Sequence, residues 1–253
     1  MRLHPAINSS ERKVLPFRSA TMSTQIVAQV RDALFARELR PGDFLGTEKD
    51  LSGRFGVSRI VARDALRTLE AQGVVDIKVG SGGGARIARG NARLFAEALA
   101  VQLDLAGVSA GEIMDAQRAI ECLAAELAAV NSTAEDHARR RDLIADAEAK
   151  IDDVGAFTRS SREFHLAVAE ASHNRVLVVQ LISLQHVSWP ERNPTLTPKV
   201  ARRILDAHKE LASLIEIRDA AGARRLMDDH VKMIAARRVA EQRDKRSAER
   251  DCC

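Results

Sequence analysis

The chain has 253 residues, enough for two domains with separate cores, and its 45% hydrophobic and 29% charged residues exclude an intrinsically disordered protein. No apolar run reaches the roughly 18 residues of a membrane span, and three cysteines do not make a disulfide framework, so we expect a soluble, cytoplasmic protein. The net charge of +4 is concentrated near the N-terminus, because residues 1–90 carry 15 Lys and Arg against 9 Asp and Glu, whereas residues 91–253 carry 24 against 26, and this favours a polyanionic partner.

The N-terminal segment begins without periodicity. Residues 1–20 are polar and contain two prolines, which predicts a mobile arm. From Ser23 to Leu39, apolar residues recur at helical spacing and predict a first helix, which Pro41-Gly42 ends.

Two short helices are predicted next, joined by a glycine turn. Thr47 is a good N-cap for the first of them, with acidic residues in its first turn, and Gly56 supplies the left-handed residue that ends it. Ser58 caps the second helix, and Gly73 ends it. Two short helices joined by a tight turn that contains glycine form the helix-turn-helix pattern.

The second of these helices separates its residues by face. Four apolar residues recur at spacings of three and four and are predicted to face a core: Ala62, Ala65, Leu66 and Leu69. Arg59, Arg63 and Arg67 recur every four residues on another side, where they and Ser58 are predicted to contact DNA. A guanidinium group matches O6 and N7 of guanine, so these arginines are candidate base readers. Lys49, in the preceding helix, is placed for a phosphate or an adjacent base.

Two short runs then flank a glycine-rich tip. Residues 74–79 and 85–88 are the flanks, and the tip runs from Gly80 to Gly84, a pattern that predicts a β-hairpin, or wing. Gly82 and Gly83 carry no side chain, so they are predicted to let the backbone of the tip enter a minor groove.

This segment closely resembles the winged helix-turn-helix of the GntR family of bacterial transcription regulators, over roughly residues 24–89. The resemblance is carried by four runs: Arg40-Pro41-Gly42-Asp43, Glu48-Lys49-Asp50-Leu51, Gly56-Val57-Ser58-Arg59 and Leu69-Glu70. The family usually has Pro-Ser before the glutamate, where this chain has Gly46-Thr47, and it often has a charged residue in the wing tip, which here is almost all glycine. The resemblance implies a regulator that binds double-stranded DNA.

After Ala88 the pattern stays helical. The candidate helices span residues 91–106, 109–130, 133–153, 155–172, 174–188, 198–219 and 222–245, and the short loops between them imply antiparallel neighbours in a bundle. Cys122, inside one of these helices, is predicted to be buried. We therefore expect a mainly α protein: the arm, a winged helix-turn-helix domain over 21–90, an all-helical domain over 91–245, to which the family resemblance assigns effector binding and dimerisation, and a tail over 246–253.

Three histidines in the helical half have suggestive positions. His165 lies inside a helix, and His208 and His230 lie on two consecutive helices joined near Ala220. At about 1.5 Å per residue, His208 is roughly 18 Å before that turn and His230 roughly 15 Å after it, so they are almost level in an antiparallel hairpin. Converging neutral imidazoles suit Zn²⁺, Ni²⁺ or Mn²⁺, although such histidines are also common as core residues.

The same half resembles the all-helical ligand-binding domain of FadR-type GntR regulators, called the FCD domain, over roughly residues 93–240. The resembling residues are Arg118 with Glu121, Phe164-His165 followed by Asn174, His208, and the run Asp219, Ala223, Met227, His230. Many members bind a metal through one aspartate and three histidines, and that metal holds a small carboxylate effector, which implies a site at His165, His208 and His230. Ser161 stands where the aspartate is expected, so the site is either completed by water and effector or has lost its metal; Glu163 points elsewhere on the helix.

Arg118 and Glu121 are the candidate effector-binding residues. They lie beside a second line of residues that is predicted to be the core stripe of their helix: Ile113, Ala116, Ile120, Leu123 and Leu127. Arg118 either forms an ion pair with Glu121 or clamps an effector carboxylate. Trp189, in the long loop before Pro198, either covers a pocket or packs locally.

The sequence thus predicts a ligand-responsive transcription regulator and not an enzyme. We expect a homodimeric repressor that binds a palindromic operator and is released or retuned by a small carboxylate at the metal site. The alternative is a metal-free sensor of an acyl-CoA or another lipid-like molecule. A remote alternative is a metal-dependent hydrolase fused to a DNA-binding domain, which needs a general base beside the metal.

Overall fold

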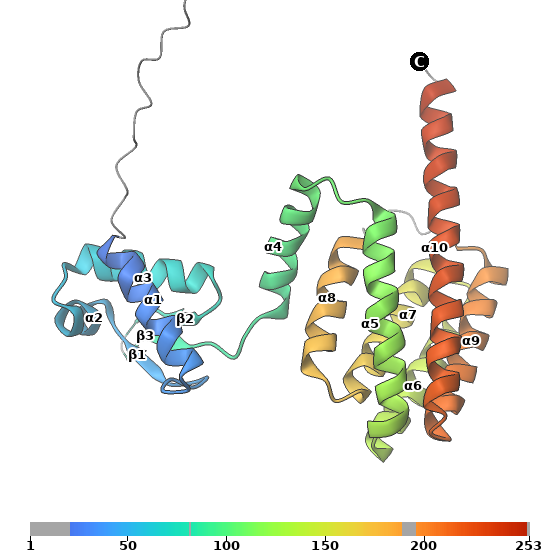
Figure 1. The fold of residues 1–253 in the computed structure, drawn as a ribbon, viewed down its shortest axis with the longest axis horizontal. Coiled ribbons are helices and arrows are strands. Elements are labelled where there is room, and N and C mark those ends of the chain that lie inside the picture. The colour runs from blue at the N-terminus through green and yellow to red at the C-terminus, as the bar shows by residue number, and fades with distance from the viewer. Residues whose placement is uncertain (1–20, 81, 189–195, 252–253) are drawn as a thin grey trace, which may run out of the picture. The chain divides into compact units, whose positions relative to one another are not determined.

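The computed structural model describes residues 21–80, 82–188 and 196–251, and they form two compact units that divide between Asn91 and Ala92 (Figure 1). The predictions on the arm over residues 1–20 and on Trp189 lie outside the described residues. Within the described ranges, no helix is both long enough and apolar enough to cross a membrane.

The N-terminal unit has the predicted pair of capped short helices. It contains α1 (Met22–Phe35), β1 (Phe44–Gly46), α2 (Glu48–Phe55), α3 (Arg59–Ala71), β2 (Val75–Lys78) and β3 (Gly84–Ile87). Thr47 caps α2 and forms a reciprocal capping box with Asp50, and Gly56 ends α2 with a φ of 63°. Ser58 caps α3, as predicted.

Two features of this unit differ from the prediction. Helix α1 ends at Phe35 rather than at Leu39, because Arg37 takes a left-handed conformation with a φ of 62° and the next two amides both donate to the carbonyl of Ala33. Strand β1 was not predicted at all, since its three residues are too few to show a period.

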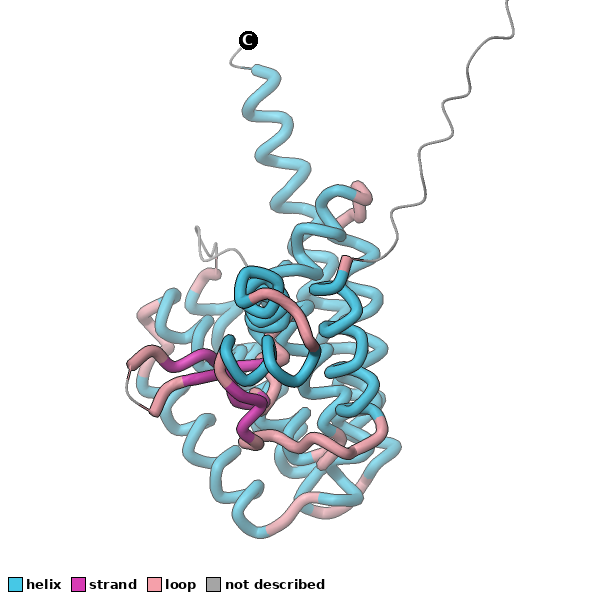
Figure 2. The backbone as a smooth tube through the Cα atoms, turned by 90° about the vertical axis from the view of Figure 1, so that its left-hand side faces the viewer, coloured by secondary structure: helices cyan, strands magenta, loops and turns pink. Residues whose placement is uncertain are grey.

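The three strands form one antiparallel sheet in the order β1-β3-β2 (Figure 2). Strands β2 and β3 pair from Val75 with Ile87 to Lys78 with Gly84, so the predicted wing hairpin is confirmed. On its other side β3 pairs with β1, and a Cβ atom at Gly84 would lie 2.7 Å from the ring of Phe44. Only glycine fits at this point, because the two strands and the aromatic ring leave no room for a side chain.

A hydrophobic core joins the helices of the N-terminal unit to the sheet. The four predicted inner residues of α3, Ala62, Ala65, Leu66 and Leu69, are all buried in it, together with Leu51 of α2 and residues of α1 and the wing. Burial of this stripe fixes the rotation of α3 about its axis and leaves its opposite side in solvent.

The C-terminal unit is entirely helical in its described part. Its elements are α4 (Ala92–Leu105), α5 (Ala110–Asn131), α6 (Ala134–Ala149), α7 (Val154–Ala171), α8 (Arg175–Ser188), α9 (Pro198–Glu216) and α10 (Ala220–Asp251). All seven predicted helices are present, and the predicted mainly α fold is confirmed. Helix α10 continues past the predicted end at residue 245.

Helix α5 lies at the centre of this unit, and the predicted core stripe on it is only partly confirmed. Ile113 is buried, and Ile120 and Leu127 pack against a core cluster with α7 and α8, but Ala116 and Leu123 are exposed. A further buried line contains small residues, among them Cys122, Ala125, Ala128 and Ala129, which pack with Phe164, Leu211 and Met227 from α7, α9 and α10. These small side chains let the neighbouring helices approach α5 closely.

Candidate DNA interface and candidate metal centre

The exposed side of α3 carries the three predicted arginines. Arg59, Arg63 and Arg67 are all exposed, and Ser58 at the N-cap uses its hydroxyl to accept from the amide of Val61. At about 100° per residue, the arginines fall within roughly 80° of arc on one side of the helix. This is the geometry of a recognition helix whose first turns face a groove.

Ile60 lies beside this arc and was not singled out from the sequence. It is 77% exposed, and its position on the wheel lies between those of Arg67 and Asp64. Its position on the helix wheel, away from the apolar stripe of Ala62, Ala65, Leu66 and Leu69, was a signal that could have found it.

Arg63 is held by a second residue that the sequence did not mark as a site residue. Its Nε donates to Oε1 of Glu48 over 2.7 Å and its Nη2 donates to Oε2 over 2.9 Å. These hydrogen bonds from Arg63 lower the pKa of Glu48, despite a small opposing effect of burial. The neighbouring Lys49 on α2 is exposed, as a phosphate contact requires.

The wing tip is a tight turn of glycines. The amide of Gly83 donates to the carbonyl of Gly80 over 2.9 Å, and Gly82 is exposed with a φ of 79°. A Cβ atom at Gly83 would lie 2.3 Å from the carbonyl oxygen of Lys78. The turn therefore depends on glycine for its shape, and Gly82 and Gly83 present backbone rather than side chains to a partner.

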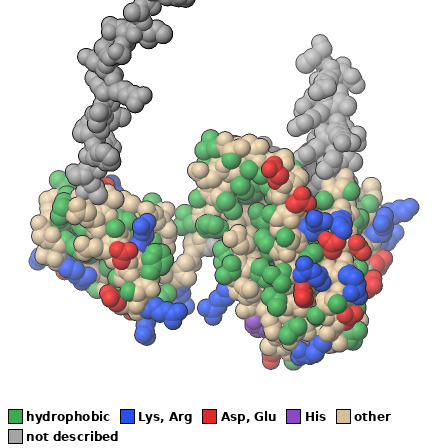
Figure 3. All heavy atoms as spheres, viewed as in Figure 1, with side chains coloured by type: hydrophobic (Ala, Val, Ile, Leu, Met, Phe, Trp, Pro, Cys, Tyr) green, Lys and Arg blue, Asp and Glu red, His purple; other side chains and the backbone are tan. Residues whose placement is uncertain are grey.

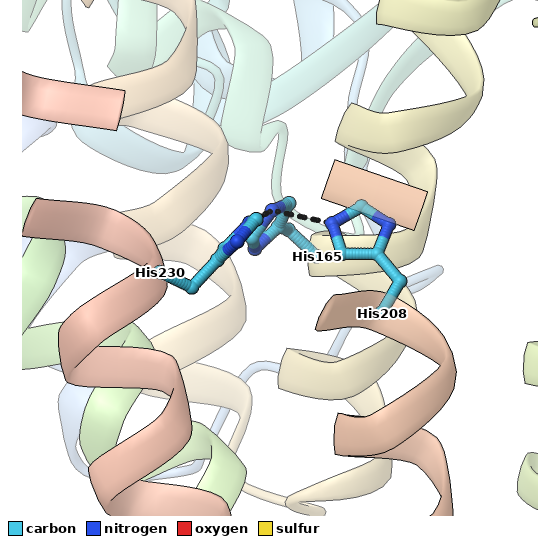
Figure 4. A group of neighbouring side chains, drawn as sticks. All are labelled: His165, His208 and His230. Atoms are coloured by element: carbon cyan, nitrogen blue, oxygen red, sulfur yellow. Dashed lines mark hydrogen bonds between the residues drawn. The ribbon is translucent and has the colours of Figure 1, made fainter. Parts of the chain in front are cut away.

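The three histidines converge from three helices of the C-terminal unit. Figure 4 shows the imidazoles of His165 on α7, His208 on α9 and His230 on α10 pointing toward one another. Nε2 of His165 lies 3.3 Å from Nε2 of His208 and 3.3 Å from Nε2 of His230. All three residues are buried, and one ligand atom from each lies within 4.8 Å of the others. The predicted levelling of His208 and His230 is thus confirmed.

Their surroundings orient the ring of His208 and keep the rings of His208 and His230 uncharged. Phe164 stacks on the ring of His208 with 4.1 Å between centroids. Burial, reinforced by His165, lowers the pKa of His230 to about 3, and burial together with the other two histidines lowers the pKa of His208 well below its ordinary value. Neutral imidazoles carry the free lone pair that a metal ligand needs.

A buried carboxylate lies behind His165. Oε2 of Glu121 is 2.5 Å from Nδ1 of His165, and Nε2 of Gln117 donates to Oε1 of Glu121 over 2.6 Å. Burial opposes ionisation of Glu121, but the contacts with His165 and the hydrogen bond from Gln117 together outweigh it, and the pKa of the carboxyl is lowered. The predicted ion pair between Arg118 and Glu121 is not formed, because Arg118 lies 3.7 Å from carboxylate oxygens of Asp115 and Asp228 instead.

The remaining candidate positions fall as follows. Ser161, one turn before His165 on α7, is buried. Glu163 is exposed, in agreement with the prediction that it points away from the histidines. Arg118 is partly exposed, with 37% of its side chain accessible at the outer side of the α5–α10 contact.

Comparison with known proteins agrees with this architecture. A model described as "Bacterial regulatory proteins, gntR family" matches residues 22–84, and the FCD domain matches residues 112–233. A Haemophilus influenzae protein named "Uxu operon regulator" is 30% identical over 203 residues, which are 76% of this chain and 73% of that protein. The chain belongs to the GntR family.

Two further comparisons extend over most of this GntR regulator. An Escherichia coli protein named "Putative L-lactate dehydrogenase operon regulatory protein" is 29% identical over 233 residues, which are 87% of this chain and 86% of that protein. The solved structure of Streptococcus agalactiae GntR covers 85% of this chain and 99% of its own, with a TM-score of 0.59 and 19% identity, and so shares the fold. The matching families are transcription regulators rather than enzymes, as predicted: the chain combines a DNA-binding domain with an FCD effector domain.

Proposed function

We propose that this GntR regulator is a dimeric repressor whose operator affinity is set by a small carboxylate, held at a divalent metal bound by His165, His208 and His230. The observation that carries the proposal is the convergence of three buried imidazoles on one point. Each ring comes from a different helix, so the site can report on the arrangement of the whole FCD domain.

The spacing of the nitrogens fits a metal. Ligands at about 2.0–2.1 Å from a tetrahedral Zn²⁺ ion lie about 3.3–3.4 Å from each other. Nε2 of His165 lies 3.3 Å from Nε2 of both His208 and His230. Three imidazole donors also suit Ni²⁺ and Mn²⁺ under different coordination numbers. When bound, such an ion would supply a Lewis acid that attracts carboxylate oxygens.

The residue at position 161 favours an anionic effector at the open position. A serine hydroxyl is a weak ligand for these metals, so Ser161 leaves a coordination position that water or a small acid can take. The name of the Escherichia coli relative refers to an operon for an enzyme of L-lactate, a small hydroxycarboxylate. We therefore place the effector in the class of small hydroxy or keto acids.

The DNA-binding part of the proposal rests on α3. One recognition helix reads only a few base pairs, and two copies related by a two-fold axis read a palindrome. Figure 3 shows hydrophobic side chains gathered over the α4 side of the C-terminal unit and charged ones over the α10 side. Exposed apolar residues on α4 include Phe95, Val101 and Leu105, and burial of these against a second copy would stabilise a dimer.

The experiment uses full-length protein purified without a histidine tag. Metal content is measured by mass spectrometry for the wild type, for His208→Ala and for His173→Ala, whose ring is half exposed and contacts Asp136. We expect about one metal per chain in the wild type and in His173→Ala, and a large loss in His208→Ala. Circular dichroism checks that each variant is folded.

The effector is then tested on DNA. Operator binding, located by footprinting beside the gene, is followed while lactate and other small hydroxy and keto acids are added to the metal-loaded protein. We expect one of them to lower the affinity, and His208→Ala to be unresponsive. A metal-free wild type that responds to acyl-CoA instead would replace this proposal with the lipid-sensor alternative.

A further inference from the structure

Glu121 is the one carboxylate that the described structure places against a histidine of the metal centre. It comes from α5, whereas the histidines come from α7, α9 and α10. Its side chain is 2% exposed, and Oε2 lies 2.5 Å from Nδ1 of His165. We propose that Glu121 is a positioning residue of the metal centre, which holds His165 with its proton on Nδ1 and its Nε2 free for the metal. This inference rests on the proposed metal site.

The contacts of Glu121 define which nitrogen is free. A neutral imidazole has one N–H and one lone pair, and a carboxylate can only accept a hydrogen bond. Glu121 therefore selects the tautomer with the proton on Nδ1, and Nε2, which faces His208 and His230, keeps its lone pair. Without this neighbour, either ring nitrogen could carry the proton.

A third residue fixes the carboxylate itself. Nε2 of Gln117 donates to Oε1 of Glu121 over 2.6 Å, and Gln117 is one turn away on the same helix. Oε1 thus accepts from Gln117, while Oε2 lies 2.5 Å from Nδ1 of His165. Because Gln117 and His165 take up its carboxylate, Glu121 is not available to bind an effector directly. The sequence had predicted an effector-binding role for it.

Glu121 also supplies negative charge at the site. Three histidines and the serine at position 161 supply no anionic group, so a divalent ion would have no anionic protein ligand. A buried carboxylate needs a compensating cation, and Arg118, the nearest candidate on α5, pairs with Asp115 and Asp228. In this chain the anionic group near the metal site is therefore the carboxylate of Glu121, which contacts Nδ1 of His165, and not a ligand at position 161.

The competing account is that Glu121 and His165 form a structural pair without relation to a metal. In that case, loss of the carboxylate would lower the stability of the metal-free fold but leave the metal affinity of the folded protein unchanged. The two accounts thus differ in a binding constant and in the tautomer of one ring, and activity on DNA is not needed to separate them.

The variant is Glu121→Gln in the full chain, and the matched control is Glu126→Gln, on the same helix, where the carboxylate contacts Arg224 at the surface. Zn²⁺ affinity is measured by competition with a chromophoric chelator, and the ligand-field spectrum of Co²⁺ reports the geometry. We expect about 10- to 100-fold weaker Zn²⁺ binding and an altered Co²⁺ spectrum in Glu121→Gln, as is typical for loss of such a partner. Glu126→Gln should match the wild type.

Two further measurements make the test independent of folding losses. In the metal-free wild type, ¹⁵N NMR of His165 should show the Nδ1-protonated tautomer, and Glu121→Gln should change it. Ser161→Asp, which adds a carboxylate at the ligand position, should tighten Zn²⁺ binding in both backgrounds and by more in Glu121→Gln.

The outcomes separate this inference from the proposed function. If the wild type binds metal and Glu121→Gln binds it equally well, the positioning role is refuted while the metal site stands. If the wild type binds no metal, the proposed site is refuted, and the tautomer of His165 in that protein still decides whether Glu121 controls the ring. An Nε2-protonated His165 in the wild type would overturn the inference.

Discussion

The contact between Glu48 and Arg63 leads to a prediction about DNA specificity. A guanidinium has five N–H donors, and Glu48 accepts from Nε and from Nη2 of Arg63, over 2.7 and 2.9 Å. At the end of the guanidinium, one N–H of Nη1 and one N–H of Nη2 point in the same direction and are not used by Glu48. That pair matches O6 and N7 of guanine, so we propose that Glu48 holds Arg63 in a conformation ready to read a G·C pair.

The size of the effect follows from the exposure of the pair. Arg63 keeps 53% of its side-chain surface and Glu48 keeps 38%, so the ion pair contributes little to stability, and Glu48→Gln should shift Tm by at most a few degrees. A free arginine loses rotamer freedom worth up to about 30-fold in affinity when it docks. An exposed ion pair removes only part of that freedom before docking. We therefore expect Glu48→Gln to lower the affinity for the specific operator about three- to tenfold.

Non-specific binding should change in the opposite direction. Glu48→Gln removes a negative charge from a surface that faces phosphates, so affinity for random-sequence DNA should rise slightly and the ratio of specific to non-specific binding should fall from both sides. Glu38→Gln, which removes one exposed charge from the same unit away from Arg63, is the control.

The assay is fluorescence anisotropy with an operator selected from a random library, and with variants of it in which each G·C pair is replaced in turn. Glu48→Gln should lose discrimination at the same base pair as Arg63→Ala, but by a smaller factor. Specific affinity that is unchanged or higher in Glu48→Gln would refute the reasoning, since it would mean that Glu48 is a bystander or withholds Arg63 from DNA.

Three further predictions concern the core, the histidines and the recognition helix. Leu51→Ala, at a fully buried position, should destabilise the N-terminal unit by about 2–5 kcal/mol in urea unfolding, whereas Val79→Ala, at a 99% exposed position, should leave the midpoint unchanged; equal effects would contradict the assigned core. The unfolded chain protonates its histidines below about pH 6.5, but burial holds the pKa of His230 at about 3, so the metal-free C-terminal unit should lose stability as pH falls from about 6.5 towards 3. Urea midpoints at pH 7, 6 and 5 should therefore fall less steeply for His230→Gln than for the wild type, and parallel curves would exclude His230 as a contributor. Ile60 is expected to contact a thymine methyl group, so replacing one operator thymine by deoxyuridine should weaken wild-type binding about three- to tenfold and leave Ile60→Ala unaffected. No sensitivity to deoxyuridine at any position would show that Ile60 lies outside the groove.

Local signals accounted for the N-terminal unit. Thr47 and Ser58 as caps, Gly56 as the terminator and the inner face of α3 were all predictable, because each depends on residues within a few positions along the chain. Strand β1 was missed because its three residues gain their conformation from pairing with β3, about 40 residues later. Helix caps can thus be predicted from the local sequence, whereas a strand such as β1 depends on tertiary contacts.

Contacts between distant helices decided the rest. The sequence favoured the line of larger apolar residues on α5 as its core stripe, and it could not show that the alanine-rich line packs against α7, α9 and α10 while Leu123 stays outside. Glu121 and His165 are 44 positions apart, so no spacing rule connects them. The convergence of the histidines was predictable for His208 and His230, since a hairpin fixes their level, and for His165 only through the family resemblance.

The division of α3 into an inner stripe and an outer arc has an evolutionary consequence. Ala62, Ala65, Leu66 and Leu69 satisfy the fold, and the wing tip is confined to glycine by its own backbone, so neither can change without loss of structure. Arg59, Ile60 and Arg67 are free of such duties. Duplicated copies of this gene could thus acquire new target sites by replacing a handful of outward residues, with the scaffold inherited intact.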